Sequence, residues 1–517
     1  MQSRTSPEWT ETERAYRWLA MAGAVVFLGL FVVLALRRMA YPYELEWMEG
    51  GMVDEVRRIL EGKQLYAAPT VDYVPYVYTP GFFYVAAGFA RLLGIGFLPL
   101  RLVSFLSSLG CFGVLFLIVR RETGDSALGL IAAGLEAATF HISGSWFDIA
   151  RSDSLFLLLF LLALYCLRFH PTTRGWALAG ALFAAAFLAK QTALFAASPV
   201  LIWAILTNWR RGLVCAAVFG GLVGGISLGW NLLSHGWYDY YVFELPRHHV
   251  IVKGLWWKFW TLDLAKRFPI PMLLAVPLFA IRTKDSARWF YAAVAAGLIG
   301  ASWLIRVRAG SYDNILIPAY AALALLAPLG VVALASQVGL RGWLSCAGLA
   351  AIAIQFLLLW YPPAKELPTE ADRKAGAQFL HRLAEIGGDA WIPGHGYLAS
   401  EVSGKSHAQT VAIGDVFTGG GPQKADLVLS IQTALHDRRF SALAMDYSDS
   451  VFLGELKQRY RKEPGDPFTD HSAFYPVTGN RTRPKTLWVL PGPDDSPPAC
   501  MLPAPVVKPA GELFSHQ

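Results

Sequence analysis

Three glutamates stand close together in residues 43–50, whose sequence is Tyr-Glu-Leu-Glu-Trp-Met-Glu-Gly. Glu46 and Glu49 are three positions apart, so in a helix they would share one face. A carboxylate that faces a membrane cavity can act as a general base toward a hydroxyl group, or it can hold a divalent cation. A solvated acidic loop would show the same spacing, because carboxylates are common on protein surfaces. We treat Glu46 and Glu49 as candidate catalytic residues with Glu44 in support, and as the ligands of a divalent metal if the protein binds one.

A basic residue, Arg151, lies in residues 148–154, Asp-Ile-Ala-Arg-Ser-Asp-Ser, directly before a strongly apolar segment. Charged side chains are costly in lipid and usually face a cavity or one another. The planar guanidinium of Arg151 matches the oxygens of a phosphate. The alternative is an ion pair between Arg151 and Asp153, with Asp153 capping the helix that follows.

Lys190 and Gln191 interrupt an apolar stretch that covers residues 183–200. A lysine in such surroundings either extends its amine to the membrane surface or meets an anion. Arg247 and His248, followed by a second histidine, form another cationic point. Two adjacent histidines without a third ligand nearby are a weak metal signal and are equally well explained as residues at the membrane interface.

The composition indicates which class of protein positions these residues. Hydrophobic residues make up 55% of the 517 residues and charged residues only 16%, whereas soluble domains carry about 25% charged residues. About 13% of residues 1–364 are charged, against about 22% of residues 365–517. This pattern excludes an all-soluble enzyme, a disordered chain and a disulfide-stapled module. The basic surplus falls in residues 1–364, which fits contact with anionic membrane lipids and argues against a nucleic acid partner.

Apolar runs long enough to cross a membrane as helices recur through the first two thirds of the chain. The first of them lacks a persuasive cleavage site and is expected to remain as an anchor. The sequence therefore predicts a polytopic α-helical membrane protein with about eleven transmembrane helices, near residues 16–36, 98–119, 127–142, 153–168, 175–189, 191–208, 213–233, 268–282, 289–305, 315–336 and 342–361.

The short linkers between these runs are rich in arginine, as cytoplasmic loops are. We expect a cytoplasmic N-terminus and, with an odd number of helices, an extracytoplasmic C-terminal tail. Residues 1–364 would form the membrane domain, with outer loops at 37–97 and 234–267. Within the first loop, residues 52–61 have an amphipathic pattern typical of a helix on the membrane surface, with Glu55 on the polar side. Residues 82–93 are expected to form a re-entrant or interfacial helix.

The tail, residues 365–517, is expected to be a small α/β domain. A helix is predicted over residues 369–386, with Thr369 placed to cap it and two glycines placed to end it. Short strand-like runs follow at residues 390–392, 427–431 and 486–490. Their order in a sheet is not readable from the sequence.

Taken in order, the motifs resemble those of the GT-C superfamily of membrane glycosyltransferases. This superfamily includes protein O-mannosyltransferases and the enzyme that adds aminoarabinose to lipid A, and the likeness is strongest to family-39-like bacterial members. The resemblance covers about residues 41–318. In the aminoarabinose branch a lysine that contacts the phosphate precedes the proline of a Tyr-Pro-Pro-like turn. This chain has Thr79 at that position, so Lys190, Arg151 or Arg247 would have to supply the phosphate contact. The matching motifs are Glu46-Trp47-Met48-Glu49-Gly50, Gly62-Lys63-Gln64-Leu65-Tyr66, Tyr78-Thr79-Pro80, Arg151-Ser152-Asp153 and Lys190-Gln191.

The resemblance implies transfer of one sugar, hexose or pentose, from a polyprenyl-phosphate carrier to a hydroxyl of a glycan, lipid or protein acceptor. The reaction would take place on the outer face of a bacterial cytoplasmic (inner) membrane and serve the cell envelope. Glu49 or Glu46 would be the base, and direct displacement would invert the anomeric centre. Arg151, Lys190 and Arg247 would bind the donor phosphate. Residues expected on the supporting or acceptor side are Glu44, Tyr78, Asp153, Gln191 and His248.

A transporter or lipid flippase is the main alternative. Such a protein would show paired similar halves and broken helices near the middle of the membrane. The sequence shows no similar halves, and in the expected topology its polar groups gather at one boundary. A scaffold without catalysis would not need the acidic loop (residues 43–50), Arg151 and Lys190 together.

Overall fold

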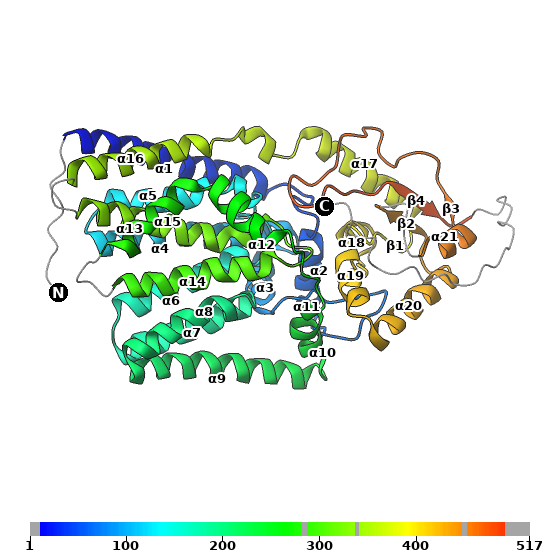
Figure 1. Cartoon of the computed structure of the whole chain (residues 1–517). Coiled ribbons are helices and arrows are strands. Elements are labelled where there is room, and N and C mark those ends of the chain that lie inside the picture. The colour runs from blue at the N-terminus through cyan, green and yellow to red at the C-terminus, as the bar shows by residue number, and fades with distance from the viewer. Residues whose placement is uncertain (1–10, 282–286, 337–340, 447–451, 492–517) are drawn as a thin grey trace.

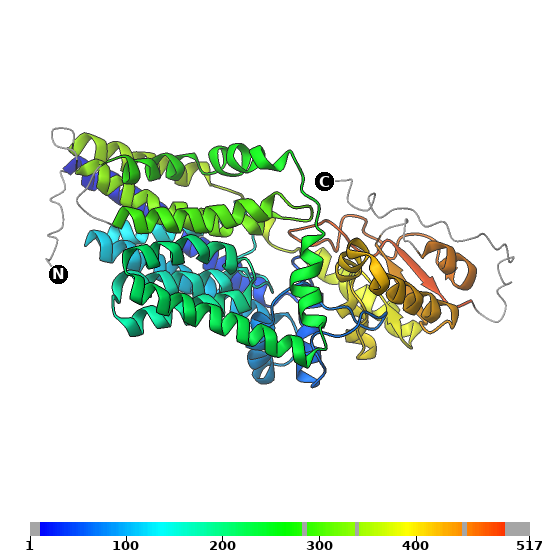
Figure 2. The same ribbon diagram turned by 60° about the horizontal axis from the view of Figure 1, so that its bottom comes forward.

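The computed structural model describes residues 11–281, 287–336, 341–446 and 452–491. Figure 1 shows a bundle of long helices and, at one of its ends, a smaller region of helices and strands. Residues 363–446 and 452–491 form this smaller region, which we call the C-terminal region. In both views α1 begins at the end of the bundle that faces away from it (Figures 1 and 2).

Each apolar segment expected from the sequence is helical over most of its length. Their bounds are α1 (Glu11–Met39), α4 (Phe97–Thr123), α5 (Ser126–Ala138), α6 (Asp153–Phe169), α7 (Thr173–Ala189), α8 (Ala193–Thr207), α9 (Trp209–Leu233), α13 (Pro269–Ala280), α14 (Ala287–Arg306), α15 (Ile317–Ala335) and α16 (Arg341–Leu358). By length and composition, five described segments can cross a membrane, and a sixth if α16 is joined to the helical segment that follows it at an angle of 62°. Several of the others have only 12–17 residues, so helix length alone supports fewer spans than eleven.

Two close helix contacts depend on glycine. A Cβ atom at Gly134 of α5 would lie 2.2 Å from the Cβ of Ala24 in α1, and one at Gly330 of α15 would lie 1.6 Å from the carbonyl oxygen of Leu274 in α13. No side chain fits at either distance. Small residues of this kind let membrane helices approach closely, and van der Waals packing then holds the bundle together.

The first loop carries α2 (Glu49–Leu60) and α3 (Gly81–Leu93). The apolar side of α2, with Met52, Val53 and Val56, is buried as expected. The polar side differs from the expectation, because Glu55 is only 2% exposed. Its carboxylate accepts hydrogen bonds from the amide of Tyr76, at 2.8 Å, and from the hydroxyl of Tyr73. Since α2 also packs against α3, α4 and the C-terminal region, it lies within the protein on both sides.

The second long loop, residues 234–267, consists of short helical pieces. They are α10 (Trp237–Asp239), the π-helix η2 (Tyr240–Glu244), α11 (Leu245–Arg247), α12 (Leu255–Lys258) and the π-helix η3 (Phe259–Lys266). The side chain of Leu245 in α11 packs against Gly419 of the C-terminal region. This segment and the first loop therefore meet the C-terminal region at the same end of the bundle.

The C-terminal region contains a four-stranded mixed sheet in the order β1-β2-β4-β3. Strand β1 (Ala390–Trp391) runs parallel to β2 (Ala442–Met445), while β4 (Thr486–Val489) is antiparallel to both β2 and β3 (Arg461–Lys462). The first helix, α17 (Glu370–Ile386), is capped by Thr369 through a capping box with Asp372 and ends at Gly387, as predicted. The other helices described here are α18 (Gly396–Ser403), α19 (Thr410–Gly419), α20 (Gly421–His436) and α21 (Leu453–Arg459).

One strand prediction is wrong. Residues 427–431 lie in α20, not in a strand. The buried positions of this helix are Leu427, Ile431, Ala434 and Leu435, which have helical spacing of three to four residues. The apolar run was too short to distinguish a strand from one turn of an amphipathic helix.

Candidate active site

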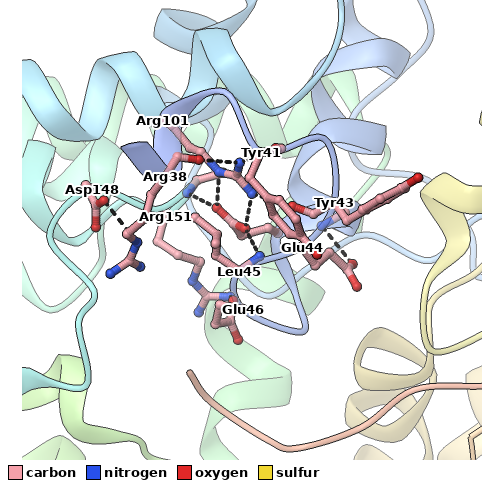
Figure 3. Close-up of polar contacts among 12 residues, drawn as sticks. Arg38, Tyr41, Tyr43, Glu44, Leu45, Glu46, Arg101, Asp148 and Arg151 are labelled. Atoms are coloured by element: carbon pink, nitrogen blue, oxygen red, sulfur yellow. Dashed lines mark hydrogen bonds and ion pairs between the residues drawn. The ribbon is translucent and has the colours of Figure 1, made fainter. Parts of the chain in front are cut away.

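Glu49 lies at the start of α2 in a fully satisfied buried ion pair. Its carboxylate oxygens are 2.7 Å and 3.0 Å from two nitrogens of Arg101, which enters from α4, and they accept hydrogen bonds from the amides of Leu45 and Ala150. Figure 3 shows the Arg101 guanidinium surrounded by oxygens of this loop. Burial would raise the pKa of Glu49, but Arg101 and the two amides outweigh it and lower the pKa. Glu49 therefore fixes the shape of the loop and has no oxygen left for a proton or a metal.

Glu46 is in the opposite situation. Its side chain is fully buried, and neither carboxylate oxygen makes a hydrogen bond with the described residues. The nearest cation is Arg151, with 3.6 Å between its Nη1 and Oε2 of Glu46, and Figure 3 shows the two side chains next to one another. Burial raises the pKa of Glu46 to about 8 against the opposing charge of Arg151. A buried carboxylate with such a pKa is suited to accept a proton near neutral pH.

Arg151 stands directly before α6 and is 6% exposed. Its Nη2 donates a hydrogen bond of 2.7 Å to the hydroxyl of Tyr78, while Nη1 has no hydrogen-bond partner among the described residues. The Tyr78 ring lies under the guanidinium at 5.2 Å and is half-buried. Arg151 thus keeps one nitrogen available for an anion, beside a side chain that is partly accessible.

Lys190 follows the last residue of α7 and forms an ion pair with Asp153. Asp153 also accepts a hydrogen bond of 3.1 Å from Asn314. The alternative expectation of an Arg151–Asp153 pair with a helix cap is wrong, because Asp153 is the first residue of α6 and makes no capping bond. Gln191 donates a hydrogen bond of 2.6 Å to the carbonyl of Val77, which holds the turn that carries Tyr78.

Glu44 points to the C-terminal region. Its carboxylate is paired with His395 and accepts a hydrogen bond of 3.0 Å from the amide of Gly50. Burial raises the pKa of Glu44 to about 7, although His395 opposes the shift. A second contact comes from Thr478, whose amide donates a hydrogen bond of 3.0 Å to the carbonyl of Leu45. The acidic loop is therefore held from both sides, by the bundle and by the C-terminal region.

The structure does not bring Arg247 and His248 into this cluster. Both side chains are exposed at the end of α11, and neither forms a hydrogen bond or an ion pair within the described part of the chain. The following residue, His249, pairs with Asp415 of α19 at 3.0 Å. No group of three His, Cys, Asp or Glu side chains that could hold a metal ion occurs among the described residues.

Arg101 and His395 were not singled out from the sequence. For Arg101 a signal existed, since a charged residue near the start of an apolar helix must find a buried partner. His395 comes from a segment that is distant in sequence and carries no recognisable motif.

Residues 77–229 match the model of a family described as dolichyl-phosphate-mannose-protein mannosyltransferase. This part of the chain includes Tyr78, Arg151, Asp153, Lys190 and Gln191. No curated protein sequence is significantly similar to the chain.

Solved structures with a similar fold include ArnT from Cupriavidus metallidurans in the apo state, with a TM-score of 0.58 and 13% sequence identity over 90% of this chain and 97% of that one. ArnT bound to undecaprenyl phosphate matches with a TM-score of 0.56 and 14% identity over 91% of this chain and 97% of that one. AglB from Archaeoglobus fulgidus, an archaeal oligosaccharyltransferase, in complex with an inhibitory peptide and a dolichol-phosphate, matches with a TM-score of 0.51 and 11% identity over 86% and 73% of the two chains. These matches confirm the resemblance that the motifs indicated, and they show that the chain shares the fold of ArnT and AglB.

Proposed function

We propose that this protein is a glycosyltransferase that moves a single sugar from a polyprenyl-phosphate donor to an acceptor hydroxyl. The observation that carries the proposal is the pair formed by Glu46 and Arg151: among the described residues, neither the buried carboxylate nor Nη1 of the guanidinium, 3.6 Å away, has a hydrogen-bond partner. A buried polar group without a partner costs stability, so such a pair needs a reason to persist. A reaction that uses both groups provides one.

In the proposed reaction Arg151 binds the phosphate of the donor through its free nitrogen and stabilises the charge that develops on the leaving phosphate. Tyr78 holds the guanidinium through its other terminal nitrogen. Lys190 adds positive charge nearby, with Asp153 and Asn314 fixing the position of its amine. The polyprenyl class of the donor is supported by two similar structures, ArnT bound to undecaprenyl phosphate and AglB in complex with a dolichol-phosphate.

We assign the base to Glu46 and not to Glu49. Both oxygens of Glu49 are occupied by Arg101 and backbone amides, whereas those of Glu46 are free to accept the proton of the acceptor hydroxyl. Attack by that hydroxyl on the anomeric carbon, with departure of the lipid phosphate, inverts the configuration. Arg247 and His248 are left as exposed residues that could contact the acceptor or lipid headgroups.

The membrane arrangement is part of the proposal. All eleven bundle helices would lie in the bilayer, with the N-terminus in the cytoplasm and the C-terminal tail, residues 365–517, outside. For a bacterial protein the site then faces the outer side of the cytoplasmic membrane. A transporter is not favoured, because the fold matches glycosyltransferases over 86–91% of the chain and the site lies at one end of the bundle.

The test is to incubate the purified protein with a panel of polyprenyl-phosphate sugars and candidate acceptors, and to measure release of the lipid phosphate. Parallel reactions with and without EDTA establish whether a divalent metal takes part. Release that depends on acceptor supports the proposal. Movement of the intact donor across a bilayer, without release, would support a flippase instead.

The pH dependence follows from Glu46. Its carboxyl is protonated below its pKa of about 8, and only the ionised form accepts a proton. We therefore expect kcat/KM to rise by about tenfold per pH unit below pH 7 and to level off above pH 8. The donor is a phosphodiester and does not titrate in this range. A profile that is flat between pH 6 and 8 contradicts the role of Glu46.

Donor binding should depend on Arg151. Arg151→Gln removes a charge-assisted hydrogen bond of about 1.5–3 kcal/mol, so the Kd for undecaprenyl phosphate should increase by about 10–150-fold. Arg91→Gln, at the exposed end of α3, is the control and should bind normally. Equal affinity of the two variants in detergent or nanodiscs would remove Arg151 from the donor site.

A further inference from the structure

A buried histidine of the C-terminal region lies between two carboxylates. Nδ1 of His395 is paired with Glu44 of the first loop, and its Nε2 is 3.1 Å from an oxygen of Asp446, the residue after β2. All three side chains are at most 6% exposed. Asp446 also accepts a hydrogen bond from the hydroxyl of Thr482. The mechanism above leaves this cluster without a role.

The cluster is packed so closely that two glycines are required. A Cβ at Gly50 would lie 2.3 Å from both the Glu44 carboxylate and the Tyr397 ring, and one at Gly394 would lie 2.4 Å from the Asp446 carboxylate. The hydroxyl of Tyr397 is also 3.3 Å from the amide of Glu44. The position of Glu44 is therefore closely determined by the C-terminal region.

The positive charge of His395 stabilises the two carboxylates beside it. Two buried carboxylates with no cation between them would repel one another and lose their hydration. Burial opposes the protonation of His395, but Asp446 and Glu44 outweigh it and raise its pKa well above the usual range. The protonated ring carries a hydrogen on each nitrogen: Nδ1 bonds to Glu44, and Nε2 lies 3.1 Å from the Asp446 carboxylate without hydrogen-bond geometry.

Glu44 and Glu46 are separated by a single residue, and their carboxylates face different partners. Glu44 meets His395, whereas Glu46 meets Arg151. Between them Leu45 is held through its amide by Glu49 and through its carbonyl by Thr478. Because a single residue separates them, we expect a change in the position of Glu44 to move Glu46 as well.

We propose that His395 is a positioning residue: by holding Glu44, it sets the acidic loop so that the Glu46 carboxylate faces Arg151 and the acceptor hydroxyl. This inference rests on the proposed function for its effect on catalysis, but its effect on the loop is independent of any activity. In this proposal the C-terminal region is part of the active site, because one of its side chains positions the acidic loop.

The experiment compares His395→Gln with a matched control, His407→Gln. His407 is also a buried histidine between two carboxylates, with 3.2 Å to Asp72 of the first loop and 2.8 Å to Asp389 of the C-terminal region. Hydrogen–deuterium exchange of the peptide covering residues 43–50 is measured in the full-length protein. We expect exchange in His395→Gln to rise by about tenfold or more in this peptide, and exchange in His407→Gln to rise near residues 70–76 instead. Unchanged exchange over residues 43–50 in His395→Gln overturns the proposal.

Kinetics with a donor that the wild type uses provide the second measurement. His395→Gln should lower kcat by about 10²-fold, as expected for a small misplacement of a catalytic group, with the KM for donor within about twofold because Arg151 and Lys190 are untouched. His407→Gln should keep the wild-type kcat. The double variant Glu44→Gln/His395→Gln should be no slower than the slower of its two single variants, since both changes act on one contact.

The outcomes separate the two proposals. If exchange rises as expected but the wild type transfers no sugar, the proposed function fails while the loop is still held by His395. If the wild type is active and His395→Gln has a normal kcat, or both histidine variants lose kcat equally, the positioning role is wrong.

Discussion

Glu46→Gln is expected to lower kcat for sugar transfer by about 10²–10⁴-fold, the range that a general base contributes. The amide has nearly the same shape as the carboxylate but cannot accept the proton of the acceptor. Binding of undecaprenyl phosphate should be retained, because Arg151 and Lys190 remain in place. The measurement is release of lipid phosphate under single-turnover conditions, with donor affinity determined separately.

The same variant should be at least as stable as the wild type. The pKa of Glu46 is raised on folding, so the stability that comes from its protonation is present below pH 4.5 and is lost as the pH rises through about 8. Glutamine does not titrate, and the melting temperature of Glu46→Gln relative to wild type should therefore increase over this range. Glu61→Gln, at an exposed position after α2, should match the wild type in both rate and stability. Full activity in both Glu46→Gln and Glu49→Gln would remove the assignment of a base in this loop.

Glu49→Gln is expected to lower the free energy of unfolding by about 3–5 kcal/mol, because it leaves the buried guanidinium of Arg101 without its counter-charge. Arg101→Gln should cost a similar amount for the converse reason. Both side chains are 0% exposed, so water cannot compensate. Unfolding by heat or denaturant in a fixed detergent is the measurement.

The double variant Glu49→Gln/Arg101→Gln identifies the cause. If the cost arises from an unpaired buried charge, the double variant should lose less than the sum of the two single losses. A surface pair on the same loop is the control: Lys63 and Glu61 are 2.7 Å apart but 59% and 41% exposed, and breaking them should cost less than about 1 kcal/mol. Additive losses at Glu49 and Arg101 would mean that the ion pair itself is not what stabilises the loop.

Much of the helical framework could be predicted from the sequence because apolar runs in a membrane protein must form helices to satisfy their backbone. The cap at Thr369 and the glycine at the end of α17 were equally predictable, since their chemistry is local. Two strands of the sheet were found and two, β2 and β3, were not. A strand of two to four residues that pairs only with distant segments leaves little trace in a sequence.

The candidate site could be predicted only in part, because contacts between distant segments leave little trace in a sequence. The resemblance grouped Glu46, Arg151 and Tyr78, and the structure places Arg151 next to both of the others. The resemblance could not distinguish Glu46 from Glu49, because the difference lies in Arg101, 52 positions further along the chain. Nor could it predict that Lys190 pairs with Asp153, or that Glu44 meets a histidine more than three hundred residues away. Which charge is paired and which is left free depends on tertiary contacts alone.

The bond between Thr478 and Leu45 has a consequence for the order of assembly. The acidic loop is translated more than four hundred residues before Thr478, one of its partners. A chain that stops before Thr478 keeps every helix of the bundle but cannot complete this loop.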